Sequence, residues 1–209
     1  MRIPYPKFLL LLLLVTIPVI SAQSVDKRYL IWVSPSETKQ VYGIMFNFWP
    51  NEGIGVQYPS IYGAEINLNP IGLFAPVITL VHAVFDPATH HMGDVDPDIL
   101  DISKFKKING IQVGSINMEP SVINGLDINA TMSAQSKVNG ISISAVMNKQ
   151  YIMNGITIAP IANHADKCNG IQMGLVNTSK KLKGFQFGLW NINQKRSLPL
   201  INWSFSGKK

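Results

Sequence analysis

Cysteine is almost absent from this sequence of 209 residues, and its scarcity excludes one means of stabilising the fold. Cys168 is the single cysteine, so no disulfide can form within the chain. It occupies a repeat position that elsewhere carries Ile108, Ile123, Val138 and Met153. We therefore predict that Cys168 is a small buried hydrophobe, and that packing and hydrogen bonding stabilise the protein without cross-links.

The sequence also lacks the short motifs that mark common enzyme sites. No Gly-x-Ser-x-Gly, His-Glu-x-x-His or phosphate-binding loop occurs. A polar stretch at 86–101 lacks the glycine and the downstream glutamate of a calcium loop, although its aspartates alternate. We interpret it as a solvated loop, and we assign no catalytic residue, cofactor site or metal ligand. The less favoured alternatives are a metal-dependent enzyme site in the 90–98 loop (His90, His91, Asp94, Asp96 and Asp98) and a site of His164 with Asp166, where we expect His164 in a turn.

Apolar runs long enough to span a bilayer as a helix are missing as well. The longest run, 8–20, follows Arg2 and Lys7 and precedes the small residues Ser21 and Ala22. This arrangement predicts a secretory signal peptide at 1–22, and an uncleaved anchor is the alternative. No cysteine follows the expected cleavage site, so a lipoprotein anchor is not supported. The remaining residues, 23–209, are predicted to form a single β-repeat domain.

Acidic residues are scarce in the second half of the chain. Residues 23–103 carry three Lys or Arg against nine Asp or Glu, whereas residues 104–209 carry thirteen against three. A positively charged half can attract anionic lipid, polysaccharide or nucleic acid. Arg196 is the only arginine in that half, which disfavours dedicated phosphate recognition, and we expect no nucleic-acid partner.

What the sequence does contain is a fifteen-residue repeat. Asn-Gly occurs at 109, 124, 139, 154 and 169, and Lys183-Gly184 follows one residue early. The position two before each glycine is apolar, as are the first and third positions after it. The fourth position after it is always small or short, which suits close backbone packing. Such alternation predicts strands that bury their apolar positions on one face.

Two structures can accommodate a repeated Asn-Gly pair. It favours tight hairpin turns, but a two-residue hairpin needs longer strands than a fifteen-residue unit supplies. It also suits the corner of a β-solenoid, where asparagines stack in register and glycine allows a sharp bend. We predict an all-β fold, a β-solenoid-like stack. The alternatives are an antiparallel meander and an outer-membrane β-barrel.

Lysines add a second periodicity to the repeat. Three residues before each glycine, lysine alternates with an aliphatic residue, which suggests coils of thirty residues that hold two units each. The lysines would then stack along one edge, with Lys181 joined more loosely. This lysine edge can bind anionic envelope polymers or lipids, or it can block unwanted pairing between sheets, and another envelope protein is the alternative partner. The alternating positions are Lys107, Val122, Lys137, Ile152 and Lys167.

The remaining segments complete the predicted domain. Residues 41–68 contain two repeat-like strands, and 106–193 hold the regular repeats. Between them, 70–103 combines an apolar segment with the acidic insertion. We predict a short capping helix near 70–85, and a helix in a membrane interface is the alternative. An aromatic-rich strand at 198–205 closes the domain.

The last two repeats resemble a known group of proteins. Gly-Ile-Gln-Met-Gly-Leu-Val-Asn at 170–177 and Gly-Phe-Gln-Phe-Gly-Leu-Trp-Asn at 184–191 are similar to the G-[ILV]-Q-[ILV]-G-[LI]-x-N unit of the surface-repeat proteins of Gram-negative bacteria. The match is close over 169–205 and looser over 41–168. The resemblance implies an exported β-repeat protein of the cell envelope without an established activity. We therefore expect a non-enzymatic envelope protein with a structural, adhesive or interaction role, located in the outer membrane, at the cell surface or in the periplasm.

Overall fold

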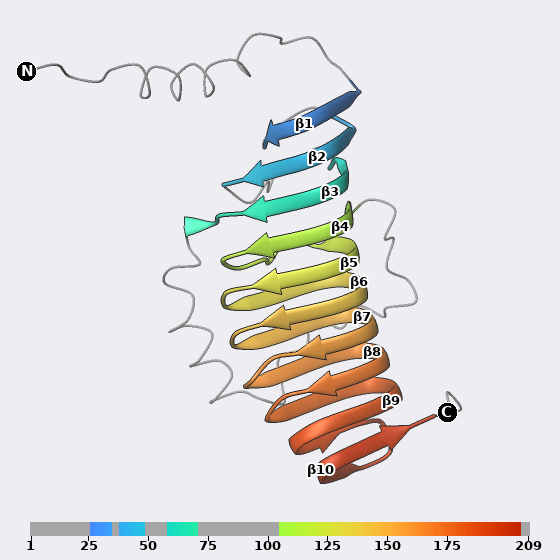
Figure 1. Ribbon diagram of the computed structural model, residues 1–209. Coiled ribbons are helices and arrows are strands. Elements are labelled where there is room, and N and C mark those ends of the chain that lie inside the picture. Colours follow the sequence, from blue (N-terminus) through green and yellow to red (C-terminus); the bar gives the residue numbers. More distant parts are fainter. Residues whose placement is uncertain (1–25, 35–37, 49–57, 71–104, 206–209) are drawn as a thin grey trace, which may run out of the picture.

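The computed structural model describes residues 26–34, 38–48, 58–70 and 105–205, and the described strands form one ten-stranded sheet (Figure 1). The strands follow one another in chain order across the sheet. They are β1 (Lys27–Val33), β2 (Gln40–Asn47), β3 (Ser60–Asn67), β4 (Lys106–Gly114), β5 (Ser121–Asn129), β6 (Met132–Ser144), β7 (Met147–Ile158), β8 (Ala162–Met173), β9 (Val176–Ile192) and β10 (Ser197–Ser204).

Parallel pairing in register identifies the fold as a β-solenoid. Gly110 pairs with Gly125, and Gly140 pairs with Gly155, so one coil contains fifteen residues. The predicted solenoid is confirmed, whereas the thirty-residue coil is wrong. An antiparallel meander and a barrel are excluded for the described strands, because β1 to β9 run parallel in a linear order and only β10 runs antiparallel, against β9.

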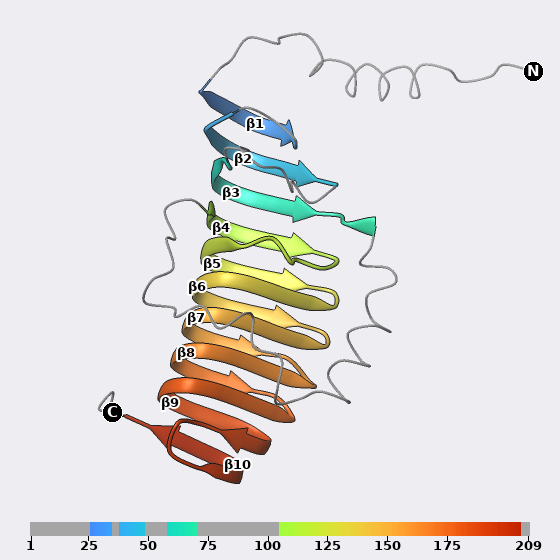
Figure 2. The same cartoon turned by 180° about the vertical axis from the view of Figure 1, so that it is seen from behind.

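Each regular coil has a front segment and a return segment, visible from opposite sides in Figures 1 and 2. In β6, residues 137–144 form the front segment and pair with the Asn-Gly-containing parts of β5 and β7. Residues 132–135 of β6 form the return segment and pair with the start of β7. The coils therefore enclose a narrow interior between their front segments and their return segments.

The Asn-Gly pairs lie in the middle of the front strands, and neither predicted position, at a hairpin or at a corner, is correct. The paired glycines have φ between 134° and 149°. A Cβ on Gly140 would lie 2.0 Å from the carbonyl oxygen of Gly125 in the previous coil. Only a residue without a side chain allows both this backbone conformation and this approach. The glycine column thus sets the distance between successive coils.

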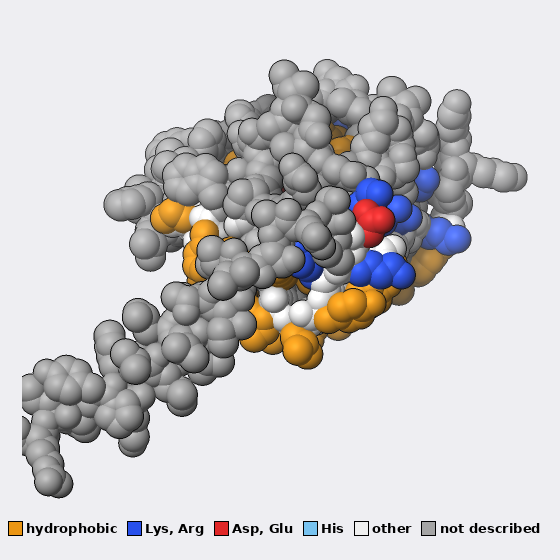
Figure 3. Space-filling view, turned by 90° about the horizontal axis from the view of Figure 1, so that it is seen from above, with side chains coloured by type: hydrophobic (Ala, Val, Ile, Leu, Met, Phe, Trp, Pro, Cys, Tyr) orange, Lys and Arg blue, Asp and Glu red, His pale blue; other side chains and the backbone are white. Residues whose placement is uncertain are grey.

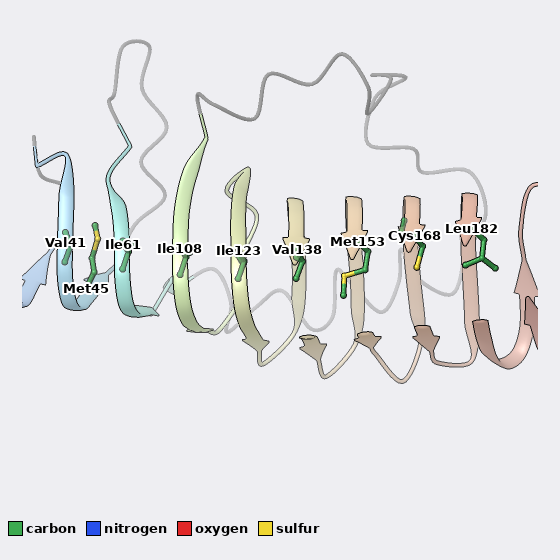
Figure 4. Packing of buried hydrophobic residues seen from close by; sticks show 10 residues of the cluster. Val41, Met45, Ile61, Ile108, Ile123, Val138, Met153, Cys168 and Leu182 are labelled. Carbon is green, nitrogen blue, oxygen red and sulfur yellow. The ribbon is translucent and has the colours of Figure 1, made fainter. Parts of the chain in front are cut away.

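The interior combines one apolar and one polar column of side chains. The inner apolar column lies two residues before the glycines and is shown in Figure 4 together with Met45, which lies two residues after its glycine. The inner polar column lies two residues after them and is fully buried. The members of the apolar column are Val41, Ile61, Ile108, Ile123, Val138, Met153, Cys168 and Leu182, and those of the polar column are Glu65, Gln112, Asp127, Ser142, Thr157, Gln172 and Gln186.

The prediction that all the apolar positions share one buried face is therefore wrong. Successive strand residues point to opposite sides, so positions two before and two after glycine share the inner side. The first and third positions after glycine point outward: Ile111 and Val113 are 45% and 41% exposed. Alternation along the backbone, rather than side-chain polarity, decides which residues are buried.

Several predicted segments lie outside the described residues. These are the signal peptide at 1–22, the capping helix near 70–85 and most of the insertion at 70–103. The strands predicted within 41–68 are present as β2 and β3, and the predicted closing strand at 198–205 is present as β10. Among the described residues, no helix is long and apolar enough to cross a membrane.

Candidate interaction surface

The outer side of the front strands carries a continuous apolar surface, which we call the apolar face. It consists of the first and third residues after each glycine, stacked in register from β2 to β9. β10 extends it, because Ile201 and Trp203 pair with Phe187 and Phe185 on the neighbouring strand. Its most exposed members are Ile44, Ile111, Val113, Ile141, Ile143, Met173, Phe185, Phe187, Ile201 and Trp203.

A ladder of asparagines borders the apolar face. Asn124 donates from Nδ2 to Oδ1 of Asn109 at 2.8 Å, and Asn139 donates likewise to Asn124 at 2.6 Å. Asn154 and Asn169 continue the ladder at 2.7 and 2.8 Å. The stacking predicted from the repeat is thus confirmed. The border from Asn109 to Asn169 consists of uncharged amides, and these amides are hydrogen-bonded to one another from coil to coil.

Aromatic side chains occupy both ends of the surface. At the amino-terminal end, Tyr42 stacks on Tyr29 and Tyr62 in line with the asparagine ladder, with ring centroids 5.4 and 5.0 Å apart. At the carboxyl-terminal end, Phe205 packs edge-on against Phe185 at 5.1 Å. The surface is therefore apolar or aromatic from β1 to β10.

The lysine edge lies beside this surface. Lys107 pairs with Val122, which pairs with Lys137, so these two lysines are separated by one coil. Ile152 separates Lys137 from Lys167 in the same way, and Lys181 is next to Lys167. Two strand spacings correspond to about 10 Å. Lys107, Lys137 and Lys167 therefore share one edge but lie on alternate coils, so the direct stacking predicted from a thirty-residue coil is wrong. Figure 3 shows Lys and Arg side chains next to hydrophobic ones.

The exposed charge of residues 105–205 is entirely positive. The three acidic residues of this range, Glu119, Asp127 and Asp166, are all buried. Exposed cations lie on several strands and on the turn before β10: Lys107, Lys180, Lys181, Lys183, Lys195 and Arg196. A surface with this excess of positive charge attracts anions.

Glu119 and Asp127 are held inside the solenoid by polar partners, and Glu65 of β3 lies beside the first of them. Lys106 Nζ lies 2.7 Å from Glu65 Oε1 and 2.5 Å from Glu119 Oε2. Burial alone would lower the pKa of Lys106, but the two carboxylates outweigh it and raise the pKa above its ordinary value. Asp127 accepts hydrogen bonds from Ser133 and Ser142 at 2.6 and 2.8 Å, and burial nevertheless raises its pKa. These groups stabilise the interior and do not reach the outer surface.

The pair formed by His164 and Asp166 lies on the return segment in β8, not in a turn as predicted. His164 Nε2 is 3.5 Å from Asp166 Oδ1, and Lys180 Nζ is 3.0 Å from the same oxygen. Burial raises the pKa of Asp166, but hydrogen bonding and charge from His164 and Lys180 outweigh it and lower the pKa. An ion pair across adjacent coils accounts for this arrangement.

The other predicted candidates do not form a site in the described part of the chain. Cys168 is buried, and burial raises the pKa of its thiol to about 12, so the predicted buried hydrophobe is confirmed. Residues 26–34, 38–48, 58–70 and 105–205 contain no group of three or more His, Cys, Asp or Glu that could hold a metal ion. The loop with His90, His91, Asp94, Asp96 and Asp98 lies outside the described residues.

Sequence reasoning missed the apolar face, although the sequence contained a signal for it. Positions two before glycine and one after glycine are both apolar, yet they are three positions apart, which is an odd interval. In an extended strand they cannot point to the same side. Comparison with protein-family models, with curated proteins and with solved structures found no match.

Proposed function

We propose that this protein is an exported, non-enzymatic component of the cell envelope whose solenoid serves as an interaction scaffold. The signal peptide expected at 1–22 and the resemblance of residues 169–205 to the surface-repeat proteins of Gram-negative bacteria support the location. The confirmed repeat fold supports the scaffold role, since stacked coils create long, regular surfaces.

The observation that carries this proposal is the exposure of the apolar face. Contiguous exposed apolar patches beyond a few hundred Å² mark interaction sites in soluble proteins. Here two stacked columns of aliphatic and aromatic residues follow the length of the sheet, and the lysine edge lies beside them. An interaction role accounts for both features.

The test is the location and accessibility of the protein in cells that produce it. Fractionation and protease treatment of intact cells should place the chain, shortened at its amino terminus, outside the cytoplasm. A matched variant, Leu12→Arg, interrupts the apolar core of the expected signal peptide and should retain the longer form inside. Cytoplasmic retention of the unaltered protein, with no shortening, would contradict the proposed location.

A further inference from the structure

We propose that the apolar face and the lysine edge together dock the solenoid on an anionic lipid surface, with the front strands lying flat against it. This assignment names the partner of the proposed interaction scaffold and rests on that function.

The shape and chemistry of the apolar face suit a lipid surface. Residues one before, one after and three after each glycine point outward along the front strands, and Lys183 is the only charged residue among them from β1 to β9. Contact with lipid therefore removes apolar side chains from water, and Lys183 is the one charged side chain among these positions that it would dehydrate. The outer asparagines already satisfy one another, so they tolerate the edge of such a contact.

The charge distribution selects an anionic lipid over a second copy of the chain. A second copy packed through this surface would add a second set of lysines without contributing an exposed acid from 105–205. Anionic headgroups carry the opposite charge, and lysines extend readily from an apolar surface toward phosphate. A soluble anionic polymer would satisfy the lysines but would leave the apolar face in water.

Aromatic residues at the two ends are consistent with the same partner. Tyr29 and Tyr62 at one end, and Trp203 at the other, are all more than 40% exposed. Tyrosine and tryptophan are enriched where an apolar phase meets water, because their rings are amphipathic. The surface therefore combines an apolar centre, aromatic ends and a cationic margin.

Co-sedimentation of the full mature chain, 23–209, with lipid vesicles tests the proposal. We expect the protein to bind phosphatidylcholine vesicles that contain phosphatidylglycerol and to bind pure phosphatidylcholine at least tenfold more weakly. The double variant Ile141→Asp with Ile143→Asp places two charges on the face and should reduce binding to the mixed vesicles more than tenfold. Both side chains point outward, so the fold should survive, as circular dichroism and thermal unfolding would verify.

A matched control places the same charges away from the apolar face. Met118 and Thr178 lie on return segments, and Met118 is 61% exposed. Met118→Asp with Thr178→Asp changes the net charge equally and should leave much stronger vesicle binding than the face variant. Equal losses in both double variants would show only a dependence on net charge and would overturn the docking surface.

The lysine edge is tested by a second matched pair. Lys107→Gln with Lys137→Gln removes two edge lysines, whereas Lys149→Gln with Lys195→Gln removes one lysine of a return segment and one of the turn before β10. A lysine near an anionic membrane strengthens binding by about fivefold. The edge variant should therefore lose roughly twentyfold or more in affinity for mixed vesicles, and the control variant clearly less. Equal losses would again contradict a specific edge.

Three further results would overturn the proposal. One is a wild-type chain that fails to bind the mixed vesicles. Another is a dimer in size-exclusion chromatography that Ile141→Asp with Ile143→Asp dissociates, which would assign the face to a second copy. The third is binding of soluble lipid-free polyanion that matches vesicle binding and is unaffected by that variant. If the chain is exported but gives any of these three results, the proposed envelope function stands and the lipid-docking proposal fails. If the chain remains in the cytoplasm but binds vesicles, only the proposed envelope function is contradicted.

Discussion

The front strands carry many polar side chains on their inner side and apolar ones on their outer side, which is the reverse of most globular sheets. Inside, the solenoid buries glutamine, aspartate and an ion triad beside one apolar column, and outside it exposes isoleucine, valine and phenylalanine. Buried polar groups are costly only when they lack partners. Here polar groups recur at equivalent positions of successive coils, so Gln186 Nε2 donates to Gln172 Oε1 at 2.8 Å, and Asn163 Nδ2 donates to Asn177 Oδ1 at 3.0 Å. Stacking gives buried polar groups partners on neighbouring coils, while apolar side chains occupy the surface.

Adjacent lysines on opposite sides of β4 give the largest expected contrast. Lys106→Met should destabilise the protein by about 4 kcal/mol, because the buried carboxylates of Glu65 and Glu119 lose the ammonium group between them. Lys107→Met removes an exposed lysine and should change the free energy of unfolding by less than about 0.5 kcal/mol. Urea denaturation measures both. Similar values for the two variants would mean that the buried triad does not stabilise the interior.

The Asn-Gly pair of β6 offers the next contrast. Gly140→Ala should cost about 3 kcal/mol or more, because it combines a strained positive φ with overlap against the Gly125 carbonyl. Asn139→Ala removes two part-exposed ladder hydrogen bonds and should cost about 1 kcal/mol. Thermal unfolding of both variants checks the order. A Gly140→Ala protein as stable as Asn139→Ala would contradict the glycine column as the determinant of coil spacing.

Two isoleucines of β4 test burial directly. Ile108 is fully buried and Ile111 is 45% exposed, although only two residues separate them. Ile108→Ala should cost about 2 to 3 kcal/mol through lost burial and a cavity. Ile111→Ala should cost less than about 1 kcal/mol, since its side chain is already partly in water. The apolar face would need reassignment as core if the second variant unfolded as readily as the first.

The smallest expected effect is a dependence on pH. Burial raises the pKa of Asp127 above 3.8, and Glu65 adds to this shift. The folded state therefore binds the proton more tightly than the unfolded state does. The stability from this group is fully present below pH 3.8 and is lost as the pH rises through the folded pKa. Asp127→Asn lacks this loss, so its stability relative to wild type should improve between pH 4 and pH 7.

Asp166→Asn serves as the control of opposite sign. The pKa of Asp166 is lowered, so this residue stabilises the fold above its unfolded pKa, and that stability is lost as the pH falls through the folded pKa. Relative to wild type, Asp166→Asn should therefore become less stable as the pH rises. Denaturant unfolding at several pH values distinguishes the two variants. Parallel pH profiles for both would contradict the assigned directions.

The repeat made much of the fold predictable from sequence. Glycines at a fixed interval indicated stacked coils, and the stacking of Asn109 to Asn169, the lysine edge and the buried position of Cys168 followed from that spacing. The coil length was misjudged because lysine and aliphatic residues alternate at one position. Lys137 and Ile152 nevertheless occupy equivalent places in adjacent coils, since either side chain fits at that edge.

The inner and outer sides were harder to predict because polarity and strand alternation disagreed. Gln112 and Asp127 appear suited to water when each repeat is considered alone. Gln112 donates to Asn129 on the next coil. Asp127 accepts from Asn129 on its own strand, from Ser133 on the return segment and from Ser142 on the next coil. Only the assembled stack reveals that these polar residues can be buried, and therefore that Ile111 and Val113 must point outward.

The register of the glycine column allows chain length to vary between coils without disturbing the sheet. Gly63 pairs with Gly110 just as Gly140 pairs with Gly155, although far more chain separates the first two positions. The solenoid thus constrains where a strand re-enters the stack but not how much sequence intervenes. Foreign peptide segments inserted between β3 and β4 should therefore be displayed beside an intact sheet, which makes this junction suitable for grafting epitopes or reporter domains.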